Sequence, residues 1–341
     1  MAKAPQAANG PSAGGNPRPD VNFPLLKNGL DYLVDVVDSL ATDQGEQVDA
    51  RTLKYAVLHL QAGVEVLLKA RLRREHWSLV FKKPENATRI RLTNGDFESC
   101  TTDDAFIRLK QIAGLSLQDK DVAAVKQLAR TRNALQHYEL TAPAAAIETR
   151  AADVLNFLLP FITDHLLPGL DEHQTADVHQ TMAVIRAQLR GIESFIKTRM
   201  DDLRAQLQLV AATTVVCPEC AQQALVLDAD LPSCRFCLKH WEDPSEAAAE
   251  YAWLILGQSG PAPGDEGDAP VRVCPNCSNE TLVMQALTAA APHQDTILCF
   301  ACAEVYADTA LTSCQDCDNP LPVGSGDLLC PDCTAAAFGR F

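Results

Sequence analysis

Residues 217–237 read CPECAQQALVLDADLPSCRFC, and this stretch decides the fold of the C-terminal third of the chain. It contains two C-x2-C pairs, Cys217/Cys220 and Cys234/Cys237, separated by 13 residues. Each pair can form a tight knuckle that turns both thiolates toward one point, and two knuckles supply the four sulfurs of a tetrahedral Zn²⁺ site. The connection between them is long enough for a short β-hairpin.

The same pattern recurs downstream, so that 12 of the 13 cysteines form six C-x2-C pairs. At four ligands per ion, these pairs predict three structural Zn²⁺ sites, each closed because four thiolates leave no open position for water. We expect neighbouring pairs to share the first site, whereas the last four pairs could combine in sequence or cross-brace as in RING domains. The further predicted ligands are Cys274, Cys277, Cys299, Cys302, Cys314, Cys317, Cys330 and Cys333.

Disulfides and redox-active pairs are the alternatives to zinc. Disulfides require an oxidising compartment, and the N-terminal residues MAKAPQ contain no apolar segment of a secretion signal. A redox pair does not usually recur six times in one chain.

Cys100 lies outside the pattern, and we expect it to be a small buried apolar residue. The six pairs, three of which carry proline after the first cysteine, resemble the zinc ribbon; this implies ribbons over residues 213–243, 271–308 and 309–341.

Charge is distributed unevenly along the chain. The net charge is −15, and residues 215–341 hold 4 Lys/Arg against 18 Asp/Glu, a net of −14. Nucleic-acid binding requires cations that neutralise phosphates, so the ribbons are expected to meet a protein partner, to make a self-contact or to be structural.

Residues 69–91 carry the opposite charge, with 8 Lys/Arg against 2 Asp/Glu. This segment is either a solvated helix face with its loop or a surface for a polyanion such as RNA. The residues that we expect to guide RNA, on the second reading, are Arg71, Arg73, Arg74, Lys82 and Lys83, together with Arg130.

Helical periodicity marks residues 23–210. Residues 1–20 are rich in Ala, Pro, Gly and Asn, which predicts a disordered tail. A helical domain is expected over residues 21–168, because apolar residues recur every three or four positions in several segments. These segments are 24–41, 50–76, 101–112, 116–140 and 143–166. Residues 77–100 are expected to be a connection, and Thr101–Asp104 is a typical helix start.

Residues 169–212 are predicted to form one long helix, since a narrow apolar stripe runs from Val178 to Val210 in steps of three and four. Such a stripe is typical of a coiled-coil seam, but it also fits a helix packed within a bundle.

Residues 244–270 are expected to form a short helix followed by a Gly/Pro/Asp linker. No apolar run approaches the ~18 residues of a membrane span, so we expect a soluble, cytoplasmic protein.

The segment RTRNALQHY, residues 130–138, lies near the end of a predicted helix and could carry chemistry. Asn133 and His137 are four residues apart and share a face, and the long side chain of Arg132 can reach the same place. Histidine can act as general base or acid near neutral pH, whereas arginine can hold a phosphate. An ordinary histidine at a helix end is the alternative interpretation.

Arg-Asn-x3-His within a helical bundle resembles the HEPN family, and the segment 53–70 looks like the helix that packs against the motif helix in that family. The resemblance covers roughly residues 23–166. It implies a metal-independent endoribonuclease of toxin or defence type, a homodimer in which two motifs line one cleft, and cleavage that uses the 2′-hydroxyl of the RNA. The catalytic residues would be Arg132, Asn133 and His137. Some members carry a modified tyrosine two positions after the histidine, but here that position is Glu139.

The expected fold is therefore mainly α: a HEPN-like helical bundle with a long helix, then three small four-cysteine β zinc ribbons. The ribbons would serve recognition or regulation. The alternative is a non-catalytic dimeric zinc-binding adaptor that binds a protein partner through its acidic ribbons.

Overall fold

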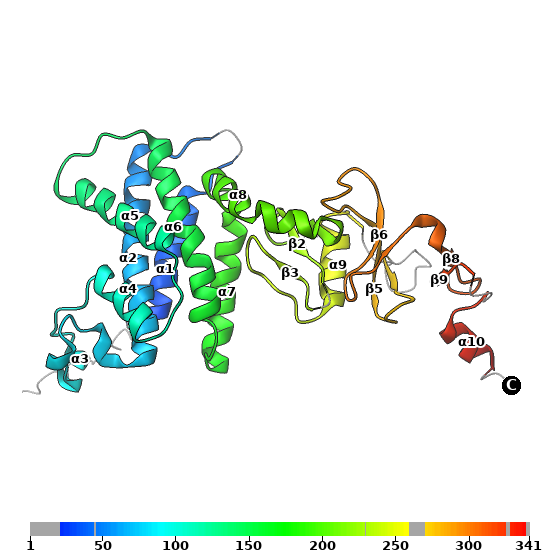
Figure 1. Cartoon of the computed structure of the whole chain (residues 1–341), viewed down its shortest axis with the longest axis horizontal. Coiled ribbons are helices and arrows are strands. Elements are labelled where there is room, and N and C mark those ends of the chain that lie inside the picture. Colours follow the sequence, from blue (N-terminus) through cyan, green and yellow to red (C-terminus); the bar gives the residue numbers. More distant parts are fainter. Residues whose placement is uncertain (1–20, 44–45, 229, 259–269, 325–327, 339–341) are drawn as a thin grey trace, which may run out of the picture.

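The structure is a computed structural model that describes residues 21–43, 46–228, 230–258, 270–324 and 328–338. The predicted tail at 1–20 and most of the predicted linker at 258–270 lie outside these residues. The chain is mainly α-helical, and its C-terminal part carries three small antiparallel sheets. The helical part and the sheets follow one another along the long axis of the molecule (Figure 1).

Eight α-helices precede the first strand in the described part of the chain. They are α1 (Leu25–Leu40), α2 (Ala50–Glu75), α3 (Arg89–Asn94), α4 (Thr102–Gln111), α5 (Asp119–His137), α6 (Ala144–His165), α7 (Glu172–Leu189) and α8 (Glu193–Leu209). Two short 3₁₀ turns, η1 (Trp77–Val80) and η2 (Pro84–Asn86), lie between α2 and α3, and a third, η3 (Ala211–Thr213), follows α8.

Helix α2 is the centre of the helical part, because α1, α4, α5 and α6 all pack against it. Its predicted apolar stripe is buried over its whole length, from Leu53 to Leu72. The Asp49 carboxylate begins the helix by accepting the N–H groups of Arg51 and Thr52. Helix α1 approaches α2 closely at Gly29, where a Cβ atom would lie 2.6 Å from the Leu67 side chain.

Residues 77–100, which we expected to be a plain connection, form a short structured insertion. Its backbone is fixed from α4, where the Arg108 guanidinium donates to the carbonyls of Leu79, Phe81 and Lys82. Helix α4 begins at a capping box between Thr101 and Asp104, as the sequence predicted. The insertion therefore lies over the ends of α2 and α4.

The prediction of one long helix over 169–212 was wrong. Helices α7 and α8 are separated by a turn at Arg190–Ile192, where the Gly191 carbonyl accepts the N–H of Thr42 at 3.0 Å. The chain turns so that α7 packs on α1 while α8 packs on α6. Each helix thus buries its apolar face within this chain, so the stripe belongs to a bundle and the coiled-coil alternative fails.

The three sheets are built from hairpins. The first comprises β1 (Thr214–Val216), β2 (Gln223–Val226) and β3 (Ser233–Cys234); the second β4 (Val271–Val273), β5 (Glu280–Ala286), β6 (Thr296–Cys299) and β7 (Val305–Tyr306); the third β8 (Leu311–Ser313) and β9 (Pro320–Pro322). All neighbouring strands pair antiparallel. A 3₁₀ turn η4 (Asp308–Ala310) precedes β8, and α10 (Pro331–Phe338) ends the described chain.

Helix α9 (Pro244–Leu254) joins the first sheet to the second. Its Tyr251 is fully buried, packs on Phe300 and accepts the N–H of Leu287 through its hydroxyl. One continuous apolar core runs from the helical part through the first sheet and into the second, whereas the third sheet has a small core of its own. The first two sheets are therefore extensions of the helical domain.

Candidate functional site

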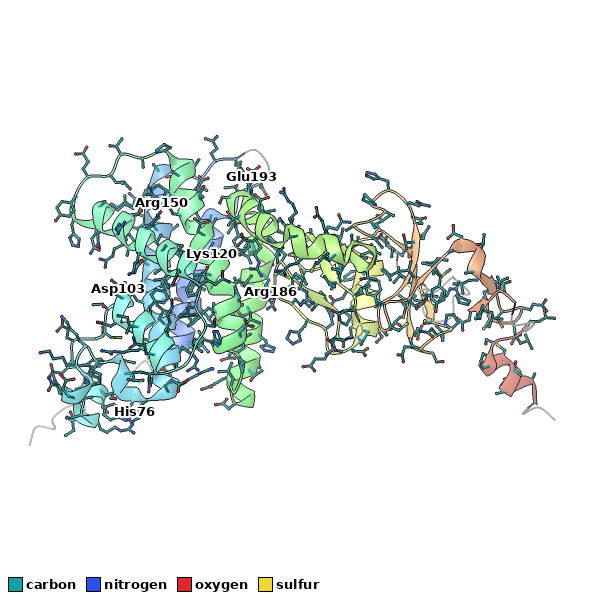
Figure 2. All side chains as sticks on the ribbon, viewed as in Figure 1. His76, Asp103, Lys120, Arg150, Arg186 and Glu193 are labelled. Carbon is teal, nitrogen blue, oxygen red and sulfur yellow. The ribbon has the colours of Figure 1, made fainter. Side chains whose placement is uncertain are left out.

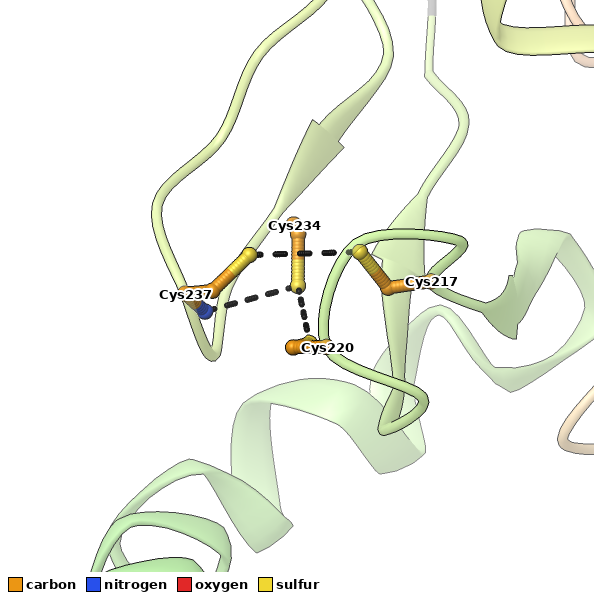
Figure 3. A group of neighbouring side chains, drawn as sticks. All are labelled: Cys217, Cys220, Cys234 and Cys237. Carbon is orange, nitrogen blue, oxygen red and sulfur yellow. Dashed lines mark hydrogen bonds between the residues drawn. The ribbon is translucent and has the colours of Figure 1, made fainter. Parts of the chain in front are cut away.

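The first four-cysteine cluster lies between the β1–β2 turn and the turn after β3, and all four of its thiols are buried (Figure 3). The Sγ atoms of Cys217 and Cys237 are 3.9 Å apart, and those of Cys220 and Cys234 are 3.7 Å apart. The two knuckles that the sequence paired are thus brought face to face.

The second and third clusters have the same plan. Knuckle Cys274/Cys277 faces Cys299/Cys302, and Cys314/Cys317 faces Cys330/Cys333, so neighbouring pairs combine in sequence and the cross-braced alternative is wrong. Each of these two clusters has two buried and two half-buried thiols. Access to solvent therefore distinguishes them from the first cluster.

The spacing of the sulfurs fits zinc. Zn–S bonds of about 2.3 Å in a tetrahedron require sulfurs about 3.8 Å apart, and the sulfur pairs of the three clusters lie 3.6–3.9 Å apart. A disulfide would bring two sulfurs to about 2.05 Å, and all 13 cysteines are free. Three four-thiolate groups could thus each hold a metal ion, and thiolate sulfur at this geometry favours Zn²⁺.

A backbone feature that sequence reasoning missed shapes the knuckles. In five of them the residue after the second cysteine has φ between 58° and 60°: Ala221, Leu238, Ser278, Ala303 and Asp318. The N–H of each donates to the carbonyl of the first cysteine, as in the 2.9 Å bond from Ala221 to Cys217. None of these residues is glycine, so we attribute the left-handed conformation, which side chains disfavour, to the demands of the knuckle.

Two arginines of the helical part contact the two knuckles of the first cluster. Arg199 of α8 is buried and donates to the carbonyls of Arg235 at 2.8 Å and Phe236 at 3.0 Å, within the second knuckle. Arg186 of α7, labelled in Figure 2, lies 3.5 Å from Glu219, within the first knuckle.

We did not predict either arginine as a site residue. The available signal was the position of Arg199, because the buried face of α8 comprises Phe195, Arg199, Leu203 and Leu207. A charged residue in register with an apolar stripe indicates a buried partner.

The motif residues lie together at the C-terminal end of α5. This helix packs through Val125, Leu128 and Thr131, while Asn133 and His137 are exposed and Arg132 is half-buried. Arg132 donates from Nη1 to the Asn133 Oδ1 at 3.0 Å. The motif side chains are thus available to a ligand.

Three of the six predicted RNA-guiding cations, Arg71, Arg74 and Lys82, make contacts within the chain. Arg71 pairs with Glu75, and Lys82 pairs with Glu98. Arg74 donates to the carbonyls of His165, Leu166 and Pro168 and so caps α6. Arg73 and Arg130 are exposed, as is Lys83. The positive charge of residues 69–91 is therefore partly used to hold the fold.

The basic segment and the motif lie toward opposite ends of α6. Thr131 of α5 accepts from Arg150, near the beginning of α6, at 2.9 Å, whereas Arg74 binds His165 at its end. Fifteen residues at a rise of 1.5 Å separate these two points by about 22 Å. Figure 2 accordingly shows Arg150 near the upper edge of the helical part and His76 near the lower edge. Of the predicted guiding residues, only Arg130 lies on the motif helix.

The acidic sheets extend away from the basic segment, on the far side of α7 (Figure 1).

No helix in the described ranges combines the length and apolar character needed to cross a membrane. Comparison with models of known protein families, with curated proteins and with solved structures returns no match to this chain.

Proposed function

We propose that this chain is a metal-independent endoribonuclease of the HEPN type, with Arg132, Asn133 and His137 at the reacting centre. The observation that carries the proposal is their arrangement at the end of α5. Because other residues of this helix make its packing contacts, these three side chains are not needed for packing and can contact a substrate.

The chemistry follows from the three side chains. His137 removes the proton of the RNA 2′-hydroxyl, whose oxygen attacks the adjacent phosphorus. A 2′,3′-cyclic phosphate forms as the P–O5′ bond breaks, and the leaving 5′-oxygen takes a proton from a protonated histidine. Arg132 neutralises the charge that develops on the phosphoryl oxygens, and Asn133, which already binds the Arg132 guanidinium, positions it.

A homodimer would complete the site. Base and acid have opposite protonation states at the start of the reaction, so two histidines on two chains can divide the roles. The HEPN resemblance implies such a pairing of motifs in one cleft. The exposed Tyr138, with 83% of its surface accessible, would then lie in the interface.

The test is cleavage of a structured RNA by the zinc-loaded protein in buffer without Mg²⁺. We expect His137→Ala and Arg132→Ala to lower the rate by at least ~10²-fold, since general acid–base catalysis contributes 10²–10⁴. Gln136→Ala, an exposed neighbour in the same turn, should cleave like the parent protein. Equal cleavage by His137→Ala and the parent would refute the assignment.

A non-catalytic adaptor is the second candidate, and the net charge of −14 over residues 215–341 favours it. In that case the acidic ribbons would hold a basic protein partner. Expression in cells separates the two: a nuclease is toxic, and Arg132→Ala or His137→Ala relieves the toxicity. An adaptor shows neither effect.

A further inference from the structure

The first four-cysteine cluster differs from the other two in how it is held. All four of its thiols are buried, and its cysteines belong to the same apolar core as α1–α8. The second and third clusters each have a small core of their own. A metal ion at the first cluster would therefore sit inside the helical domain, not beside it.

Arg199 is a buried cation beside this cluster. Its Nε and Nη2 donate hydrogen bonds to main-chain carbonyls of the Cys234–Cys237 knuckle. In the described part of the chain its guanidinium makes no ion pair with a carboxylate within 4.0 Å. A buried guanidinium requires a nearby negative charge, and a zinc ion with four thiolates carries a formal charge of −2. Burial lowers the pKa of Arg199, whereas the charges of Cys234 and of the Asp202 carboxylate oppose that shift.

A chain of hydrogen bonds continues from Arg199 into the helical domain. Its Nη1 donates to the Asn156 side chain of α6 at 2.9 Å, and Asn156 donates to Asp202 at 2.9 Å. The same Asp202 oxygen accepts from Lys120 at 2.8 Å. Lys120 lies in the first turn of α5, the helix whose last turns carry Arg132 and His137.

We propose that Arg199 couples metal occupancy of the first four-cysteine site to the packing of α8, α6 and the start of α5. With zinc bound, the fixed knuckle presents two carbonyls and a net negative charge to the guanidinium. Without zinc, the knuckle loses its shape, the buried cation loses its partners, and the Asn156–Asp202–Lys120 contacts loosen. The metal would then regulate RNA cleavage from a distance, a consequence that rests on the proposed function.

Hydrogen exchange of the full-length protein tests the coupling without reference to activity. Cys234→Ser with Cys237→Ser should increase exchange at least tenfold in α8 and in α6 around Asn156. Cys330→Ser with Cys333→Ser, the matched change at the third site, should leave both helices as in the parent. Unchanged protection of α8 after loss of the first site would overturn the proposal.

Arg199 itself is tested by zinc release to a chromogenic chelator. We expect Arg199→Met to release the slowest of the zinc ions at least tenfold faster than the parent protein. Arg204→Met, an exposed arginine of the same helix, should change that rate less than twofold. An unchanged rate for Arg199→Met argues against the role.

Two further measurements keep the outcomes distinguishable. If Arg199→Met does not fold, Arg199→Lys keeps the charge but loses the planar fork, and an intermediate release rate is expected; a parental rate contradicts the proposal. Chelator added to the parent protein should raise exchange in α8 only as the last zinc leaves. Should these effects appear while His137→Ala cleaves RNA normally, the coupling stands and the nuclease assignment falls.

Discussion

Arg74 donates from Nη1 to the main-chain carbonyl of His165 at 3.2 Å, which joins the end of α2 to the end of α6. The last carbonyls of a helix have no partner within the helix, and the same guanidinium also serves Leu166 and Pro168. A residue that we expected to guide RNA is thus a helix cap supplied from a neighbouring helix.

Replacement of Arg74 should therefore affect stability. We expect Arg74→Met to lower the free energy of unfolding by about 1–3 kcal/mol, because it leaves a set of carbonyls without a charged donor. Urea denaturation followed by circular dichroism measures this. Arg73→Met is the matched control, since Arg73 is exposed and adjacent. Equal stability of the two variants would show that the cap is unimportant.

The close approach of α1 and α2 gives a second prediction. In Gly29→Ala the new Cβ would lie 2.6 Å from Cγ and Cδ2 of the fully buried Leu67. Overpacking of this kind typically costs about 1–3 kcal/mol, which outweighs the gain of about 1 kcal/mol in helix propensity. Thermal unfolding should show a lower Tm.

Gly63→Ala is the control for this crossing. Its Cβ would meet the nearest atom, Cβ of Tyr32, at 3.3 Å, so only a slight adjustment is needed. We expect it to be close to neutral or slightly stabilising. A larger loss for Gly63→Ala than for Gly29→Ala would contradict the packing described above.

Metal content is the third prediction. The full-length protein should bind three zinc ions per chain, and Co²⁺ substitution should give the intense visible absorption of tetrahedral thiolate sites. Cys333→Ser should lose one ion. Cys100→Ala should keep three, because Cys100 is buried apart from the three clusters. A stoichiometry of two in Cys100→Ala would place this thiol among the ligands.

Asp153 of α6 provides a prediction about pH. Burial raises the pKa of its carboxyl above 3.8, and the Asp202 carboxylate adds to the rise, whereas Lys120 opposes it. A raised pKa in the folded state means that ionisation destabilises the fold as the pH increases past the unfolded value. Asp153→Asn should therefore raise the Tm by about 1–3 °C at pH 7.

This advantage should shrink as the pH falls through the folded pKa of Asp153 and disappear below 3.8, where the parent carboxyl becomes protonated in both states. The Tm of variant and parent is compared at each pH, so zinc release in acid affects both alike. Asp38→Asn, at an exposed position of α1, should show no such trend. An advantage that grows in acid would reverse the sign argued here.

The sequence predicted the elements whose physics is local. Helix α2 followed from an apolar stripe with the helical period, and α4 from the capping box at Thr101 and Asp104. The four-cysteine clusters followed from the spacing within each knuckle. In each case the signal and the structure it predicts lie within a few residues of one another.

The prediction of one helix over 169–212 failed for a non-local reason. The apolar steps of three and four continue through Gly191. A Cβ atom added to Gly191, however, would lie 3.1 Å from Cβ of Ala41, and the Gly191 carbonyl accepts the N–H of Thr42. The partner that turns the chain is about 150 residues away. Periodicity alone does not register such a contact.

By itself, then, the sequence determined the helical class, the six C-x2-C pairs that form the cysteine clusters, and the Arg-Asn-x3-His segment near the end of a helix. Only the tertiary structure decided the partners of two arginines: Arg74 binds the end of α6, and Arg199 binds the second knuckle of the first cluster. The reason is physical. Ligand spacing and helical period are short-range properties of the chain, whereas the partner of a charge depends on which helices pack together.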